Sequence, residues 1–166
     1  MKILVAYASK HGSTTGIARA VAEKLRVAGN EVDLGTVAEV ADVSTYDGYV
    51  IGSAVYYGSW MKEATAFVES NTAWLARRPV WLFSSGPVGP AAPADPKELP
   101  ALRDAIAPQG HRVFYGALDR HHLSIGERIV VGAVKAPDGD YRDWREIDSW
   151  ADEIARELAK TEPLPV

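Results

Sequence analysis

ILVAYASKHGSTTG, residues 3–16, is the stretch of sequence that decides the fold. Its apolar first half predicts a buried β-strand, and a helical pattern of apolar residues begins at Ser13. Between them lies a loop rich in hydroxyl groups around Gly12. Such a loop directs backbone N–H groups and hydroxyls toward one point at the positive end of a helix. The stretch therefore predicts a phosphate-binding site.

The rest of the chain continues this alternation of strands and helices. Further strands are predicted at residues 31–34, 49–54, 80–84 and 112–117, after a first strand at 2–8. Helices are predicted at 13–28, 62–70, 99–106 and 144–160, the last opened by a capping box of Asp143 and Glu146. Residues 123–134 fit either a short helix or a strand followed by a turn. The proline-rich stretch 86–100 predicts a stiff, non-helical loop beside the ligand, mobile in the absence of substrate.

Strands that alternate with helices predict parallel βαβ units and a doubly wound α/β fold with three α/β/α layers. Five strands fit the order 2-1-3-4-5, which binds its ligand at the carboxyl ends of strands one and three. With 166 residues and no boundary in composition, the chain is expected to form a single domain over residues 1–166.

Composition restricts the functions that the chain can have. The net charge of −4 and the pI near 5.6 give no sign of a nucleic-acid partner. Because the chain has no cysteine, it has no disulfide or cysteine-ligated metal, and redox chemistry would need a cofactor. No metal site is predicted. The short apolar run at the N-terminus is no signal peptide, and no segment suits a membrane span, so a cytoplasmic protein is expected.

The loop after the first strand matches none of the commoner nucleotide motifs. It has neither a Walker lysine motif nor the glycine pattern of dinucleotide-binding folds. A receiver domain of the same topology needs acidic residues after strands one and three, where this chain has Ala8-Ser9 and Ser53-Ala54. A serine- and threonine-rich phosphate loop remains, and the alternative is a plain hydrophilic turn before the helix.

Two further segments lie at the same edge of the predicted sheet. The end of the third strand brings aromatic residues and glycines to the ligand-binding edge of the sheet. There they suit the binding of a flat π-system, and the alternative is that they only cover the edge of the sheet. The end of the fourth strand is small and suits main-chain hydrogen bonds to a ring edge, or is an ordinary turn. The candidate residues are Ser53, Ala54, Val55, Tyr56, Tyr57 and Gly58 in the first segment, and Ser84, Ser85, Gly86 and Pro87 in the second.

Together these motifs resemble the flavodoxin superfamily over the whole chain. More closely, residues 46–53, Tyr57-Gly58, residues 116–118 and Asp143-Trp144 resemble flavodoxin-domain proteins of the protoporphyrinogen IX dehydrogenase type, which pass electrons to menaquinone. The resemblance implies a flavodoxin-like fold with FMN as the cofactor. It also implies that Gly58 is the place of a peptide flip toward the flavin, with Tyr56, Tyr57 or Trp60 covering one face of the ring. The residues implied for the FMN phosphate are Ser9, Lys10, His11, Gly12, Ser13 and Thr14.

Three functions remain open: an FMN oxidoreductase, an electron carrier between redox proteins, and a flavin-free interaction module. The weak negative charge and the absence of an aromatic residue from 84–89 favour an enzyme with an open flavin face. Its partners would be a small molecule or quinone, with peripheral membrane contact possible. Substrate carboxylates could meet Arg120, His121 and His122, although a solvated loop is the alternative. His111 is expected at the surface, at the opposite end of the sheet, and no catalytic residue is identified.

Overall fold

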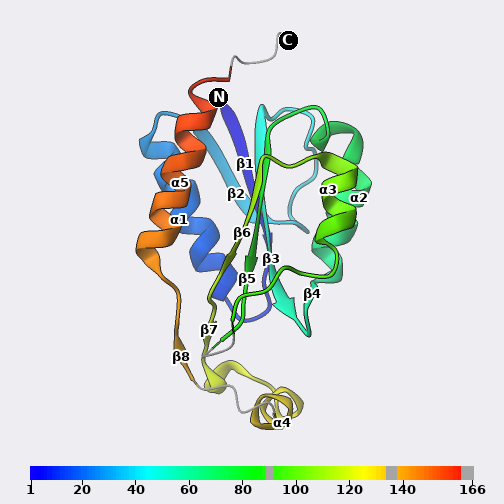
Figure 1. Cartoon of the computed structure of the whole chain (residues 1–166), viewed down its shortest axis with the longest axis vertical. Helices are drawn as coiled ribbons and strands as arrows, with labels where there is room; N and C mark the ends of the chain where they lie inside the picture. Colours follow the sequence, from blue (N-terminus) through cyan, green and yellow to red (C-terminus); the bar gives the residue numbers. More distant parts are fainter. Residues whose placement is uncertain (89–91, 134–137, 162–166) are drawn as a thin grey trace.

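The computed structural model describes residues 1–88, 92–133 and 138–161 and contains a central parallel sheet. Hydrogen bonding gives the order β2-β1-β3-β5-β6, which is the predicted 2-1-3-4-5 order with a short β4 added (Figure 1). The predicted fold class is therefore confirmed. The five parallel strands are β1 (Lys2–Ala8), β2 (Glu31–Thr36), β3 (Gly48–Tyr56), β5 (Val80–Ser85) and β6 (Gly110–Phe114).

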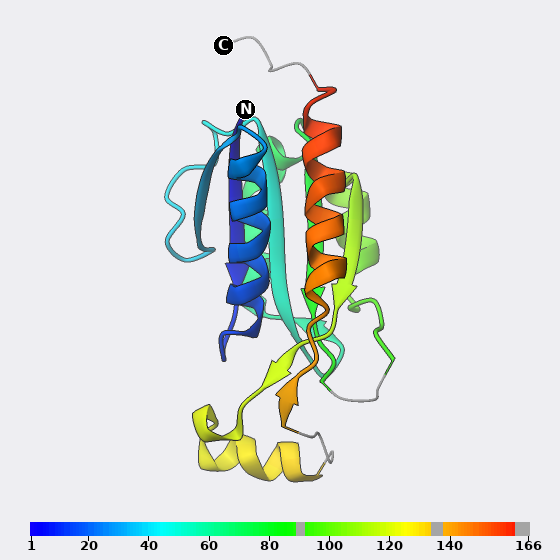
Figure 2. The same ribbon diagram turned by 90° about the vertical axis from the view of Figure 1, so that its left-hand side faces the viewer.

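Helices cover both faces of this sheet and complete three layers. On one face lie α1 (Ser13–Val27) and α5 (Trp144–Leu158), and on the other lie α2 (Lys62–Leu75) and α3 (Leu99–Ile106) (Figures 1 and 2). The apolar residues of β1 alternate between the two cores, with Ile3 and Val5 toward α1 and α5 and Leu4 toward α2. Each face of the sheet thus packs on one buried apolar cluster, and these two clusters hold the carboxyl ends of the strands in place relative to one another.

Two short antiparallel pairings lie at the carboxyl end of the sheet and were not predicted. The chain leaves β3, turns at Tyr57-Gly58 and returns as β4 (Ser59–Trp60). Farther along, β7 (Ala117–Leu118) pairs with β8 (Gly139–Asp140). The predicted strand 112–117 is thus interrupted, because β6 ends at Phe114 and pairing with a different partner begins at Ala117.

A helical excursion connects β7 to β8 and projects past the end of the sheet (Figure 2). It holds a 3₁₀ turn, η1 (Arg120–His122), and a helix, α4 (Ile125–Ala133). The segment 123–134 was left open between helix and strand, and its described part, residues 123–133, is mainly helical. None of the described helices is long and apolar enough to cross a membrane.

Candidate functional site

The predicted phosphate loop lies between β1 and α1, at the carboxyl edge of the sheet. Gly12 has a φ of 85° and immediately precedes the helix, and its N–H donates to Ser9 Oγ over 3.1 Å. Positive φ is strained for residues with a Cβ, so the turn favours glycine here. No atom lies within 4 Å of the position that a Gly12 Cβ would take. The loop therefore presents an open backbone beside the first, unpaired N–H groups of α1.

The two hydroxyls that open α1 have different surroundings. Ser13 Oγ accepts a hydrogen bond from the N–H of Ala117 at 2.8 Å and lies 3.2 Å from Ser85 Oγ. It therefore ties the loop to β5 and β7. Thr14 is fully buried, and its Oγ1 has no hydrogen-bond partner among the described residues. A buried hydroxyl of this kind costs free energy unless something else satisfies it.

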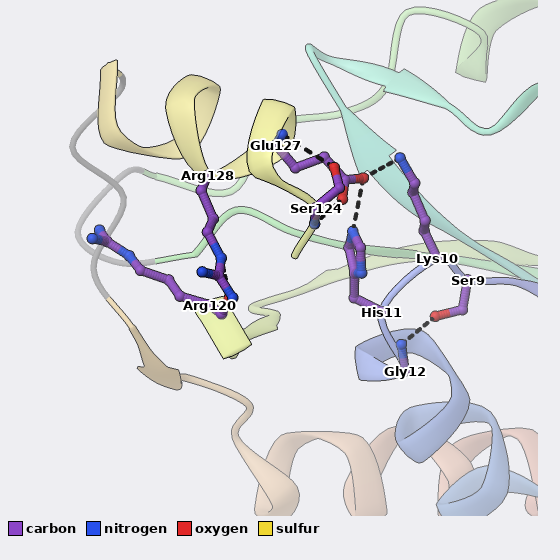
Figure 3. A network of polar contacts seen from close by, with 8 residues as sticks. All are labelled: Ser9, Lys10, His11, Gly12, Arg120, Ser124, Glu127 and Arg128. Atoms are coloured by element: carbon purple, nitrogen blue, oxygen red, sulfur yellow. Dashed lines mark hydrogen bonds and ion pairs between the residues drawn. The ribbon is translucent and has the colours of Figure 1, made fainter. Parts of the chain in front are cut away.

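Two basic side chains of the loop, Lys10 and His11, contact α4. Lys10 Nζ and His11 Nε2 both reach Glu127 Oε1, the latter over 3.2 Å (Figure 3). The contact with Lys10, followed by hydrogen bonds from Ser124 and with a smaller contribution from His11, lowers the pKa of Glu127 to about 2. Glu127 was not identified from the sequence. The pattern Ser124-x-x-Glu127 is a capping box and could have revealed the start of α4, but not its contact with the loop.

The β3–β4 hairpin forms the second side of the site. Both residues of its turn, Tyr57 and Gly58, have positive φ, of 52° and 75°. Tyr57 is 76% exposed and Tyr56 is 39% exposed, and burial raises the pKa of Tyr56. Ala54 and Ser53 are buried behind them, with Val55 half-buried between. The hydroxyl of Ser53 donates to the carbonyl oxygen of Ala54 at 2.8 Å, so it supports the hairpin from within.

Trp60 does not lie on the open side of this hairpin. It is only 3% exposed, and its indole N–H donates to Ser84 Oγ over 2.8 Å. The reason is that β4 pairs back onto β3 and carries the ring into the core between the sheet and α2. The expectation that Trp60 is a candidate to cover a flavin face is therefore wrong, while Tyr56 and Tyr57 remain candidates.

His111 is buried rather than at the surface. Its side chain is 1% exposed, its Nε2 lies 2.8 Å from Ser84 Oγ, and its Nδ1 lies 3.3 Å from Asp95 Oδ1. Burial lowers the pKa of this imidazole, with Arg103 in the same direction and Asp95 opposing. The prediction failed because the segment that carries Asp95 folds back over the start of β6. The hydroxyl of Ser84 is thereby engaged inside the protein.

The loop after β5 joins the site to its surroundings. Gly86 N–H donates to the carbonyl of Phe114, and the carbonyl of Pro87 accepts from Gly116, both over 2.9 Å. Farther along, Lys97 N–H donates to the carbonyl of Gly58 over 2.9 Å, and Glu98 accepts from the N–H of Trp60. The segment 95–98 therefore clamps the hairpin. Part of the predicted lid, residues 89–91, lies outside the described residues, and its mobility stays a prediction.

The structure thus gathers the candidate residues of all three loops at the carboxyl edge of the sheet. Arg120, proposed for substrate carboxylates, lies 3.2 Å from Asp138, and His121 is exposed in η1. Across the described ranges no three acidic or histidine side chains converge as a metal site would require. A surface hollow of about 620 Å³ lies at the opposite edge, near Arg77 and Lys160, and is no part of this site.

Comparison with known proteins identifies the family of this chain. A model of the family described as "Flavodoxin domain" matches residues 4–144. Protoporphyrinogen IX dehydrogenase [quinone] of Escherichia coli strain K12 is 24% identical to this chain, with 93% of this chain and 95% of that protein covered.

Solved structures agree with this at the level of the fold. A flavodoxin from the domain Archaea has a TM-score of 0.68 at 16% identity, covering 96% of this chain and 99% of that one. Flavodoxin 1 from Bacillus cereus has a TM-score of 0.62 at 17% identity, covering 95% and 99%. Rubredoxin oxygen:oxidoreductase from Desulfovibrio gigas has a TM-score of 0.67 at 16% identity. The match covers 96% of this chain but only 36% of the oxidoreductase chain.

Proposed function

The chain belongs to the flavodoxin domain family, and from that premise we propose that it oxidises a flat, porphyrinogen-like substrate with FMN and passes the electrons to a quinone. The coarser part of this statement, a flavodoxin-like redox protein with FMN as its cofactor, follows from family membership. The substrate class is the proposal, and it draws on the relative whose length the chain matches almost completely.

The residues of the site fit FMN. A phosphate would accept from the first N–H groups of α1, and the unpartnered hydroxyl of Thr14 lies in the same turn. The open space at Gly12 lets an anion approach the backbone closely. Tyr56 and Tyr57 offer exposed aromatic surface for the ring system, opposite the small residues that follow β5. FMN supplies reversible transfer of one or two electrons, and the protein binds it and determines what can reach it.

One observation carries the preference for an enzyme: residues 84–98, which lead away from β5, contain no aromatic side chain. A ring bound against the hairpin would therefore have a face on which no aromatic side chain of this loop stacks. A two-electron exchange requires the substrate to stack near the reactive nitrogen of the flavin, and this open face gives it room.

An electron carrier is the second candidate. It is favoured by flavodoxins that match the chain over nearly their whole length. A carrier would bring only the edge of its flavin to a partner protein, and the net charge of −4 provides weak steering toward a basic partner.

An anaerobic assay distinguishes the two functions. The FMN-loaded protein is mixed with protoporphyrinogen IX and a menaquinone analogue, and porphyrin fluorescence is followed against heat-inactivated protein. A protein-dependent rise in fluorescence that requires the quinone supports the enzyme. No rise, together with rapid one-electron exchange with a ferredoxin-type reductase, refutes the proposal and identifies a carrier.

A further inference from the structure

One carboxylate, that of Glu127, both starts α4 and fastens it to the phosphate loop. Its Oε2 accepts from the N–H of Ser124 at 2.9 Å, and Ser124 Oγ accepts in return from the N–H of Glu127 at 3.3 Å. Its Oε1 takes the contacts from Lys10 and His11 (Figure 3). The start of α4 is therefore positioned by the same carboxylate that pairs with the basic side chains of the phosphate loop.

The neighbouring residue of α4 does not compete with Lys10 and His11 for the carboxylate of Glu127. Arg128, the next residue of α4, donates through Nε to the carbonyl oxygen of Arg120 at 3.1 Å. Its hydrogen bond therefore joins α4 to η1 and is not made to Glu127. The side chains of Glu127 and His11 are 25% and 17% exposed, whereas that of Lys10 is 54% exposed. Both basic side chains are thus within reach of solvent or of a second anion at the edge of the loop.

We propose that Glu127 competes with the phosphate of FMN for Lys10 and His11, so that it holds α4 against the loop before the cofactor binds and gives way when the phosphate arrives. This rests on the phosphate residues proposed above. A phosphate bound next to Gly12 brings up to two negative charges beside the residues that Glu127 contacts. Two anions that share the same basic side chains repel each other. The phosphate also receives the N–H groups at the start of α1, so the carboxylate is the anion that is displaced.

The competition has a consequence for cofactor selection. Riboflavin has the same ring system as FMN but no phosphate, so it does not compete with Glu127. The carboxylate therefore weakens FMN binding and leaves riboflavin binding unchanged. When Glu127 is displaced, α4 is released together with its outward-facing Ile125 and Ile129, which are 80% and 68% exposed.

The first test uses Glu127→Gln, with Ser124→Ala as the matched control. Glutamine keeps the capping box but removes the charge, whereas the Ser124 variant damages the cap and retains the charge. FMN and riboflavin are titrated into each cofactor-free protein and flavin fluorescence is recorded. We expect Glu127→Gln to bind FMN about three- to tenfold more tightly, with riboflavin affinity within about twofold of wild type. Ser124→Ala leaves the ratio of the two affinities unchanged.

Contrary outcomes are equally clear. Unchanged or weaker FMN binding by Glu127→Gln, or an equal change for FMN and riboflavin, overturns the competition, because the residue would then act only through the structure of α4. If the wild-type chain binds riboflavin as strongly as FMN, the proposed phosphate residues fail together with the inference.

Limited proteolysis provides a second readout. Trypsin cleaves after Arg128, within α4, when that helix is released. FMN should increase the rate of this cleavage in the wild type, riboflavin should not, and Glu127→Gln should be cleaved rapidly even without flavin. Protection of the Arg128 bond by FMN in the wild type refutes the displacement of α4.

Discussion

Replacing Ser84 by alanine removes one oxygen on which two buried side chains depend. The indole of Trp60 can only donate, so Ser84 Oγ accepts from it at 2.8 Å and directs its own proton to His111 Nε2, also at 2.8 Å. Neutral His111 then carries its proton on Nδ1, which faces Asp95. The chain Trp60–Ser84–His111–Asp95 is therefore fully satisfied, and each link determines the direction of the next.

The expected cost follows from the burial of these groups. Ser84 is fully buried, Trp60 is 3% exposed and the His111 side chain is 1% exposed, so water does not replace the lost partner. A buried polar group left without a partner costs about 1–3 kcal/mol. With two such groups, Ser84→Ala should lower the free energy of unfolding by about 2–6 kcal/mol. For a domain of this size that lowers Tm by roughly 4–24 °C.

Urea denaturation followed by tryptophan fluorescence measures this loss, and Ser85→Ala is the matched control. Ser85 is the next residue of β5, and its hydroxyl contacts Ser13, which keeps its bond from Ala117. The control should cost less than about 1 kcal/mol. In a Trp60→Phe background, Ser84→Ala should lower the free energy of unfolding by about half as much, because the indole N–H that would lose its acceptor is already absent. A loss below 1 kcal/mol for Ser84→Ala, or full additivity with Trp60→Phe, would refute this reasoning.

Three further predictions concern the loop, the core and pH. Gly12→Val should abolish FMN binding in a folded protein, whereas Gly29→Val, which also has positive φ and open space but lies at the far end of α1, should retain it in flavin titrations. Gly52→Ala should lower the free energy of unfolding by about 3 kcal/mol or more, because the added Cβ would overlap the buried Phe83 ring. Gly110→Ala, whose added Cβ makes only an ordinary van der Waals contact, should lower it by less than half of that. Equal urea midpoints for the two variants would contradict the packing argument. Because burial lowers the pKa of His111 in the folded state, the unfolded chain binds more protons below about pH 6.5, and stability should fall as the pH drops from there through the folded pKa. His111→Gln should remove that part of the pH dependence in denaturation series between pH 7.5 and 5, and a slope as steep as that of the wild type would exclude His111 as its source.

The layers and the strand order could be predicted from the sequence because they depend on local periodicity. The continuous apolar run of β1 and the regular apolar face of α5 each identify an element without knowledge of its neighbours. Parallel topology then follows from the alternation of strands and helices. For the same reason, the loop around Gly12 and residues 53–58 were placed at the correct edge of the sheet, although the hairpin that these residues enter was not predicted.

The rest depended on contacts between segments far apart in the chain. His111 is 27 residues from its partner Ser84, and Glu127 is 116 residues from His11. No local pattern distinguishes a histidine that meets a buried serine from one at the surface. Trp60 was misplaced for a related reason, since a two-residue strand that folds back on β3 has no periodicity to detect.

The pairing of β7 with β8 places Leu118 opposite Gly139, so the segment between these two residues begins and ends at one point of the fold. A two-residue turn between these positions would close an ordinary hairpin and leave β6 and α5 where they are. In evolutionary terms, this is a site where a segment can be lengthened, shortened or exchanged without new demands on the sheet. A chimaera that carries this segment from a relative would inherit a new edge to the cofactor site on an unchanged fold.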